Sequence, residues 1–197
     1  MDFDFQIKPL KESDIDQAIV ISDKELGTNY ITSIFLQKLI HYQNTLLIGA
    51  FNKKSEIIGY GYCIIYSKKE FQTSLHPSQL KMLPNILINS EKIGVTNTIS
   101  IQKEYKNKGI GSAIFNQFLL FFKANSVKTI SAFAWKNKNV VNMESIFKKY
   151  NFSILQKTSN FWFQESIDKN YNCPACKNPP CTCEAIIYFK ELIQTKN

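Results

Sequence analysis

The chain has 197 residues, 44% hydrophobic and 13% aromatic, enough to bury one substantial core. Its net charge of +8 favours anionic partners, but all 24 basic residues are lysine, which weakens a base-reading role because arginine makes the commonest specific contacts to guanine. No segment reaches the roughly 18 uninterrupted apolar residues of a membrane span. The start MDFDFQ is acidic where a signal peptide would be basic, so we expect a cytoplasmic protein.

The N-terminal third predicts a strand, two helices and a hairpin. Phe3, Phe5 and Ile7 alternate with polar neighbours, which predicts a strand that Pro9 ends. Ser13 is a candidate N-cap for a helix that Gly27 would stop. A second helix fits the apolar spacing of ITSIFLQKLIHY. The apolar runs TLLIGAF and IIGYGYCIIY flank a polar tetrapeptide and a glutamate, which predicts a hairpin.

The rest of the chain predicts an alternation of strands and helices. Residues 67–92 are expected to form an irregular insert with one short helical piece near SQLKML. A strand follows over 93–101, with Ile93, Val95, Ile99 and Ile101 on one face. A glycine turn and a helix lead to the strand TISAFAW, a βαβ crossover. The remaining predicted elements are a helix in VVNMESIFKKY and two last strands in FSILQKTSNFWFQ and EAIIYFKEL.

The glycine turn is the first candidate site. The stretch YKNKGIG runs directly into the apolar segment SAIFNQFLLFF. The first N–H groups of a helix lack intrahelical acceptors and carry partial positive charge, and Gly109 and Gly111 would let a phosphate approach them. Lys106 and Lys108 add charge beside them. The pattern predicts a pyrophosphate site, although a glycine turn that serves packing alone is the alternative.

Two common phosphate motifs do not fit this turn. A P-loop would need Gly-Lys-Ser/Thr after four residues, and that order is absent. A dinucleotide-binding fingerprint would need a third glycine near position 114 and an acidic residue about 20 positions later. Position 114 is Ile, and no Asp or Glu occurs between Glu104 and Glu144.

The segment ISIQKEYKNKGIGSAIF resembles the signature of the GNAT superfamily of acetyl-CoA-dependent N-acetyltransferases. That signature is a hydrophobic strand, a short loop, Arg or Gln, two residues, Gly, any residue, and Gly or Ala. Lys106 stands where the family prefers Arg or Gln, which keeps the charge without the bidentate geometry. The order of predicted elements is also the family's, so the resemblance covers nearly the whole chain.

The resemblance implies an α/β GNAT fold with a mixed twisted sheet of about six or seven strands and about four helices. It implies that the backbone of Ile99 and Ile101 bonds the pantetheine arm. The family's second motif is an asparagine that precedes a helix. The segment WKNKNVVNMESIFKKYNF resembles it, which implies a cofactor contact from Asn139. The amides implied to hold the pyrophosphate lie in and around the turn, with Lys106 as a further cofactor contact beside them: Asn107, Lys108, Gly109, Ile110, Gly111 and Ser112.

The catalytic groups are less determined. The tyrosine that often acts as general acid in the family would align with Phe147, which has no hydroxyl. Tyr150, three residues further on, is our candidate proton donor, with packing as the alternative. Asn97 or Thr98 could position a water that accepts the amine proton.

Four of the five cysteines crowd into CPACKNPPCTC, as Cys173, Cys176, Cys181 and Cys183. Four thiolates within eleven residues suit a structural tetrahedral Zn²⁺, with disulfides, free thiols or an iron–sulfur centre as alternatives. We expect this knuckle, an insertion over 170–184, to rigidify a flap on the acceptor side of the cleft.

We therefore expect a single domain over 1–197 that transfers acetyl from acetyl-CoA to an amine by direct attack. The acceptor could be a small amine or a peptide, and Glu165 and Glu184 could make its site acidic. A homodimer stays open, and we expect no membrane or nucleic-acid partner. The alternatives are a non-catalytic acyl-CoA sensor and a basic zinc-containing protein that binds nucleic acid.

Overall fold

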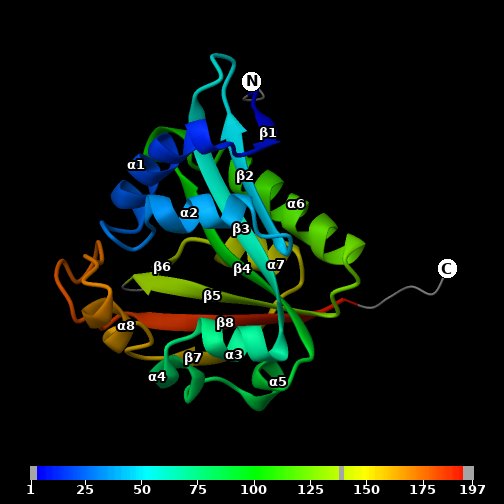
Figure 1. Ribbon diagram of the computed structural model, residues 1–197, viewed down its shortest axis with the longest axis vertical. Coiled ribbons are helices and arrows are strands. Elements are labelled where there is room, and N and C mark those ends of the chain that lie inside the picture. Colours follow the sequence, from blue (N-terminus) through cyan, green and yellow to red (C-terminus); the bar gives the residue numbers. More distant parts are fainter. Residues whose placement is uncertain (1–3, 138–139, 193–197) are drawn as a thin grey trace.

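A computed structural model describes residues 4–137 and 140–192 of the chain. Within these residues, eight strands form one mixed sheet in the order β1-β2-β3-β4-β5-β8-β7, with β6 paired to β5 (Figure 1). The strands are β1 (Gln6–Pro9), β2 (Thr45–Phe51), β3 (Ile57–Ser67), β4 (Lys92–Ile101), β5 (Thr129–Asn137), β6 (Val140–Val141), β7 (Ser153–Thr158) and β8 (Glu184–Glu191).

Helices cover both faces of this sheet. In the same described residues they are α1 (Ile15–Glu25), α2 (Ser33–Ile40), α3 (Lys68–Ser74), α4 (Pro77–Leu80), α5 (Asn85–Ile88), α6 (Ile110–Ala124), α7 (Glu144–Lys149) and α8 (Phe163–Asp168), with short 3-10 turns at Glu12–Asp14 and Lys103–Tyr105. None of them is long and apolar enough to span a bilayer. The α/β class and the mixed sheet predicted from the sequence are confirmed.

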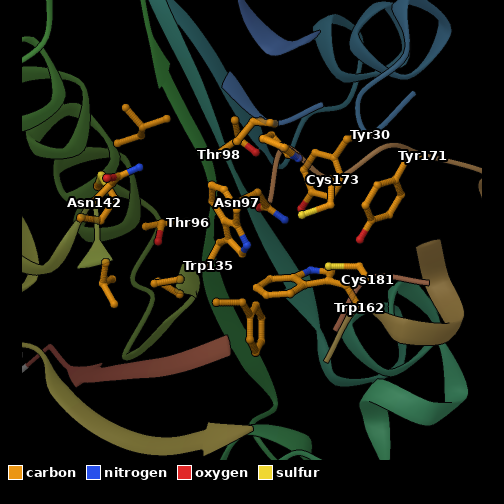
Figure 2. A pocket seen from close by; sticks show the side chains of 18 of the residues that line it. Tyr30, Thr96, Asn97, Thr98, Trp135, Asn142, Trp162, Tyr171, Cys173 and Cys181 are labelled. Carbon is orange, nitrogen blue, oxygen red and sulfur yellow. The ribbon is translucent and has the colours of Figure 1, made fainter. Parts of the chain in front are cut away.

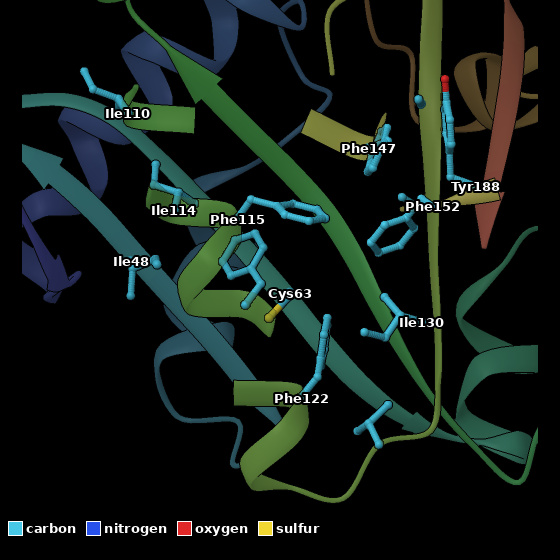
Figure 3. Close-up of a cluster of buried hydrophobic side chains, with 14 of the residues drawn as sticks. Ile48, Cys63, Ile110, Ile114, Phe115, Phe122, Ile130, Phe147, Phe152 and Tyr188 are labelled. Carbon is cyan, nitrogen blue, oxygen red and sulfur yellow. The ribbon is translucent and has the colours of Figure 1, made fainter. Parts of the chain in front are cut away.

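The central helix α6 packs on one face of the sheet because its apolar residues recur every three or four positions. Ile114, Phe118 and Phe122 are fully buried against strands β2 to β5 (Figure 3). Phe147 from α7 completes this core and stacks on Tyr188 of β8, with ring centroids 4.2 Å apart. The helix and the first turn of its N-terminus are thereby fixed relative to the strands.

The opposite face carries two separate clusters. Helices α1 and α2 bury Ile15, Ile21 and Leu36 against strands β2 and β3. The second half of the sheet is covered by helices α3 and α5 together with the segment between β7 and β8. The boundary between the two clusters runs beside β4, where Tyr30 and Tyr66 contact both.

Three expectations about elements need correction. Residues 67–92 hold the short helices α3, α4 and α5 instead of one helical piece, and Ser67 caps α3 by a hydrogen bond to the Glu70 N–H. The strand predicted over 152–164 ends at Thr158, and α8 follows. The tetrapeptide Asn160–Phe163 makes a turn with Asn160 at φ 57°, which breaks the strand and sends Phe161 and Trp162 inward.

The third correction concerns β4. Its partner register shifts between Tyr62 and Cys63, so Asn97 is an extra residue, a β-bulge. A bulge reverses which face the following side chains occupy. Ile93 therefore packs under α3 and α5, whereas Ile99 packs on the α6 side, and the predicted single apolar face does not exist.

Candidate functional site

Strands β4 and β5 pair in parallel only over Ile93–Thr96 and Thr129–Ala132, and then separate. The bulge at Asn97 begins at the point of separation. Beyond it, β4 continues to pair with β3 on one edge, while β5 continues with β8. The sheet is splayed at its centre, and the edge of β4 that faces β5 is open.

The open edge presents the backbone groups of Ile99 and Ile101. Gln102 N–H donates to Ile58 O at 3.0 Å, so these two residues form a hydrogen-bonded pair. Along an antiparallel ladder, every second residue of β4 is hydrogen-bonded to β3 in this way. Ser100 and Thr98 then bond to β3, and the N–H and C=O of Ile99 and Ile101 point toward the splay. An extended, amide-containing ligand could bond to this edge as an added strand would.

The N-terminus of α6 lies directly after this strand. Gly109 is its N-cap residue at φ 83°, a left-handed conformation that favours glycine, and Asn107 also has a positive φ of 60°. The first intrahelical bond is donated by Ala113 to Gly109 O at 3.0 Å. The N–H groups of Ile110, Gly111 and Ser112 therefore have no intrahelical acceptor.

The space around this helix start suits an anion. A Cβ on Gly109 would meet no atom within 4 Å, whereas one on Gly111 would lie 3.2 Å from Ile146. Gly109 therefore faces open space and Gly111 serves close packing of α6. Lys106 forms an ion pair with Glu25 of α1, and the Lys108 ammonium lies 5.1 Å from the Tyr105 ring centroid. Asn139 lies outside the described residues.

A cavity occupies the splay between β4 and β5 (Figure 2). Its floor is Thr96–Ile99 of β4 and Ala132–Trp135 of β5. Its other walls come from distant parts of the sequence: Leu26, Tyr30, Val141, Asn142, Met143, Phe147, Trp162, Tyr171, Cys173, Pro174 and Cys181.

The lining is aromatic and carries no Asp, Glu, Lys or His among the described residues. Tyr30 and Tyr171 meet edge to face with centroids 5.1 Å apart, and burial raises the pKa of both hydroxyls, which keeps them protonated. Asn97 Oδ1 is buried and has no hydrogen-bond partner in the described part of the chain. The described lining therefore offers hydroxyl donors and the side-chain amides of Asn97 and Asn142, but no charged base.

The acidic residues expected near the acceptor are engaged elsewhere. Glu165 accepts a bond from Lys169 at 2.6 Å and one from Gln79 at 2.8 Å. Glu184 pairs with Lys136 at 2.8 Å. Neither lines the cavity. Tyr150, our candidate proton donor, also does not line it, since its ring packs against Phe115 with centroids 5.2 Å apart.

The four cysteines of the cluster converge in the described structure. Their Sγ atoms all lie within 4.8 Å of one another, with separations of 3.5 Å for Cys176–Cys183, 3.7 Å for Cys173–Cys183 and 4.0 Å for Cys176–Cys181. Disulfide sulfurs would be about 2.05 Å apart. Four thiolates around a tetrahedral ion with bonds of about 2.3 Å have sulfurs about 3.8 Å apart. The geometry fits a metal ion.

Local hydrogen bonds prepare the cluster for a cation. Thr182 N–H donates to Cys176 Sγ at 3.4 Å. A hydrogen bond from the Cys181 thiol lowers the pKa of Cys173. Because all four ligands would be sulfur, no position would remain for a reacting water, which is typical of structural metal sites.

Sequence reasoning did not find most of the cavity residues. The cysteines and Thr98 stand in recognisable patterns, but Tyr30, Trp135, Trp162 and Tyr171 are scattered among many other aromatic residues. The one available signal was that Tyr171 lies two residues before Cys173, the first cysteine of the cluster.

Solved structures share this arrangement of a splayed sheet beside a glycine-rich helix start. Acetyl-CoA-bound NAA60 from Arabidopsis thaliana superposes with a TM-score of 0.68 at 14% identity, over 96% of this chain and 99% of that one. The Escherichia coli ribosomal-protein-S18-alanine N-acetyltransferase gives 0.64 at 10% identity, over 98% and 99%. The NatC complex bound to Gag peptide and CoA gives 0.65 at 12%, over 97% and 100%.

The chain therefore has the fold of the GNAT N-acetyltransferases, as its sequence resemblance predicted. At these identities the likeness shows the fold alone. No protein-family model and no curated protein sequence matches the chain.

Proposed function

We propose that this protein is an N-acetyltransferase that moves the acetyl group of acetyl-CoA to an amine by direct attack. The observation that carries the proposal is the splay: the open backbone edge at Ile99 and Ile101 leads on one side to the unbonded N–H groups of α6 and on the other to an aromatic cavity. An acetyl thioester held along this edge would sit where an amine in the cavity can reach it.

The cofactor contacts follow from that placement. The pantetheine amides would bond to Ile99 and Ile101, and the pyrophosphate would accept hydrogen bonds from residues 107–112. Asn139 and Lys106 keep their predicted roles as cofactor contacts. The fold neighbours support this assignment, since NAA60 was solved with acetyl-CoA and the NatC complex with CoA.

In the reaction, the amine nitrogen bonds to the thioester carbon and loses a proton. The carbon–sulfur bond breaks, and CoA leaves as a thiolate that takes up a proton. Asn97 Oδ1, which is buried and without a protein partner in the described residues, would accept a hydrogen bond from the amine or from a water that removes its proton. Tyr30 and Tyr171, protonated at neutral pH, would donate hydrogen bonds. Tyr150 stays a candidate proton donor only if its ring leaves Phe115.

The lining also bears on the acceptor. Faces of Tyr and Trp attract an ammonium group and bury apolar carbon, whereas the described lining holds no carboxylate to bind a polyamine. We expect an amine with an apolar or aromatic group next to it, such as an aromatic alkylamine or a peptide with an apolar first residue.

The test is turnover of acetyl-CoA, followed by mass spectrometry of the products, with benzylamine, 2-phenylethylamine, spermidine, glucosamine and peptides that carry either a free N-terminus or only a free lysine. We expect acetylation of the aromatic amines or apolar peptides. Acetyl-CoA binding without any acetylated product would instead favour the acyl-CoA sensor, which the absence of a hydroxyl at the cavity residue Phe147 independently supports.

We also propose that the metal in the cysteine cluster is Zn²⁺ with a structural role. Four thiolates at tetrahedral separations are a typical zinc donor set. Metal analysis of the purified protein should give about one zinc per chain, and substitution by Co²⁺ should give the thiolate absorption of a tetrahedral site.

A further inference from the structure

Two of the four cluster cysteines, Cys173 and Cys181, also line the cavity, together with Pro174 between them. We propose that the metal-bound knuckle is the outer wall of the acceptor site, so that metal occupancy controls the acceptor site and leaves the acetyl-CoA site unchanged. The inference rests on the proposed function, because it assigns the cavity to the acceptor.

The wall belongs to one segment. Trp162, Tyr171, Cys173, Pro174 and Cys181 all come from the connection between β7 and β8. After α8 ends at Asp168, this connection contains no helix or strand until β8 starts at Glu184. Figure 2 shows Cys173, Cys181, Trp162 and Tyr171 together at one side of the cavity, with Asn142 across from them.

Little apart from the cysteines fixes the end of this segment. Cys181 N–H donates to Ser166 Oγ at 2.7 Å, and Lys177 N–H to Cys173 O at 2.8 Å. Ordering a dozen residues without regular structure costs about 1 to 2 kcal/mol each in backbone entropy. A bound metal supplies such ordering free energy in small zinc modules.

The knuckle also holds the adjacent wall, the loop that carries Thr28 and Tyr30, in place. Asn172 N–H donates to Thr28 O at 3.0 Å, and Asn172 Nδ2 donates to Thr28 Oγ1 at 3.1 Å. Gly27 fits against this contact so closely that a Cβ there would lie 1.7 Å from Asn172 O. The same loop carries Tyr30, whose ring meets Tyr171. Loss of the metal would therefore loosen both walls.

The cofactor contacts lie on other elements. Ile99 and Ile101 at the end of β4 and Ile110 at the start of α6 pack in the core with Ile114 and Phe118. The knuckle contributes no described residue to that core. Acetyl-CoA affinity should therefore survive metal loss while the cavity wall changes.

The sequence has two tryptophans, and both Trp135 and Trp162 line the cavity, so tryptophan fluorescence reports this site directly. In the Trp135→Phe protein, Trp162 is the single emitter. Removing zinc with EDTA should shift its emission to the red and raise acrylamide quenching at least about twofold, and added ZnCl₂ should reverse both changes. Calorimetry should show acetyl-CoA Kd within about twofold in the two states.

Variants separate metal loss from a change in the lining itself. Cys176 and Cys183 do not line the cavity, yet Cys176→Ser and Cys183→Ser should reproduce the fluorescence change and raise the KM of the best amine from the panel about tenfold or more. Lys177→Gly is the matched control within the knuckle, because Lys177 is exposed at φ 73°, which glycine accepts. It should keep zinc, fluorescence and KM.

The proposal is overturned if metal removal leaves the acrylamide quenching of Trp162 unchanged, or if the purified and ZnCl₂-treated protein holds no metal. It is also overturned if EDTA abolishes acetyl-CoA binding, because the metal would then stabilise the whole fold and not the acceptor site alone. Failure of the proposed function is a separate result: whatever its tryptophan fluorescence, the zinc-loaded protein would not bind acetyl-CoA, or would bind it and acetylate no amine of the panel.

Discussion

At the scale of single residues, the bulge residue Asn97 has the largest consequences. The bulge at Asn97 ends the pairing of β4 with β5 and turns Ile99 to the α6 side. Asn97 also lines the cavity, and its buried Oδ1 has no hydrogen-bond partner among the described residues. A buried polar atom without a partner costs free energy, which suggests that a ligand satisfies it.

Asn97→Ala should lower kcat/KM for the amine about 10- to 100-fold and leave the acetyl-CoA Kd unchanged. This loss corresponds to one hydrogen bond to a group that gains charge in the transition state, roughly 1.5 to 3 kcal/mol. Steady-state kinetics and calorimetry measure both. The matched control is Ser100→Ala, which removes another buried and unpartnered oxygen of β4 outside the cavity lining. Equal losses in the two variants would contradict the role of Asn97.

The two glycines of the helix start should respond differently. Gly109→Ala forces an L-residue into φ 83°, which costs about 1 to 2 kcal/mol of stability, and puts a methyl into the open space proposed for the pyrophosphate. We expect weaker acetyl-CoA binding as well as lower stability. Gly111→Ala has only the flexible Ile146 side chain to displace and should change stability by less than about 1 kcal/mol. Urea unfolding and calorimetry compare the two.

At the scale of elements, α6 fixes the site through its buried face. Phe122 is fully buried in the core of Figure 3. Its ring packs so closely on β4 that a Cβ added to Gly94 would lie 2.7 Å from it. Phe122→Ala should destabilise the protein by about 3 to 5 kcal/mol. Leu120→Ala in the same helix, at a residue 52% exposed, should cost less than about 1 kcal/mol. Similar midpoints in urea unfolding would show that this face does not hold the helix.

Other elements show where local patterns mislead. The apolar stretch FSILQKTSNFWFQ alternates well enough to predict one strand, but the turn after Thr158 and the burial of Phe161 and Trp162 in the cluster with Ile93 produce a helix. Val140 and Val141 pair with β5 as β6 instead of starting α7. Tertiary contacts decide such short segments because their intrinsic preferences are weak.

At the scale of the whole molecule, buried tyrosines should govern stability at high pH. Burial raises the pKa of Tyr60 to about 12, so in the folded state the phenol stays protonated after the unfolded chain has ionised near pH 10. The folded protein then binds more protons, and stability falls as pH rises above about 10. The loss is about 1.4 kcal/mol per pH unit while this one group differs between the states.

Urea unfolding at pH 9 and pH 12 tests this, with Tyr60→Phe as the comparison, because it keeps the ring and removes the titrating hydroxyl. The difference in unfolding free energy between wild type and Tyr60→Phe should fall over this interval. A constant difference would mean that Tyr60 does not contribute to the alkaline loss.

The sequence by itself determined the α/β class, the glycine-started helix, the likeness to the GNAT signature and the candidate metal ligands, because each depends on neighbours along the chain. A turn needs glycine at fixed positions, an amphipathic helix needs its own periodicity, and four cysteines within eleven residues can meet without help from the rest of the fold.

Only the tertiary structure decided the splay, the faces of β4 and the composition of the cavity. Tyr30, Asn97, Trp135 and Tyr171 are separated by up to 141 positions, and no local pattern records that they surround one space. The same holds for the position of the cysteine knuckle against that cavity. Such placement depends on strand pairing and core packing over the whole chain, and those contacts exist only once the sheet has formed.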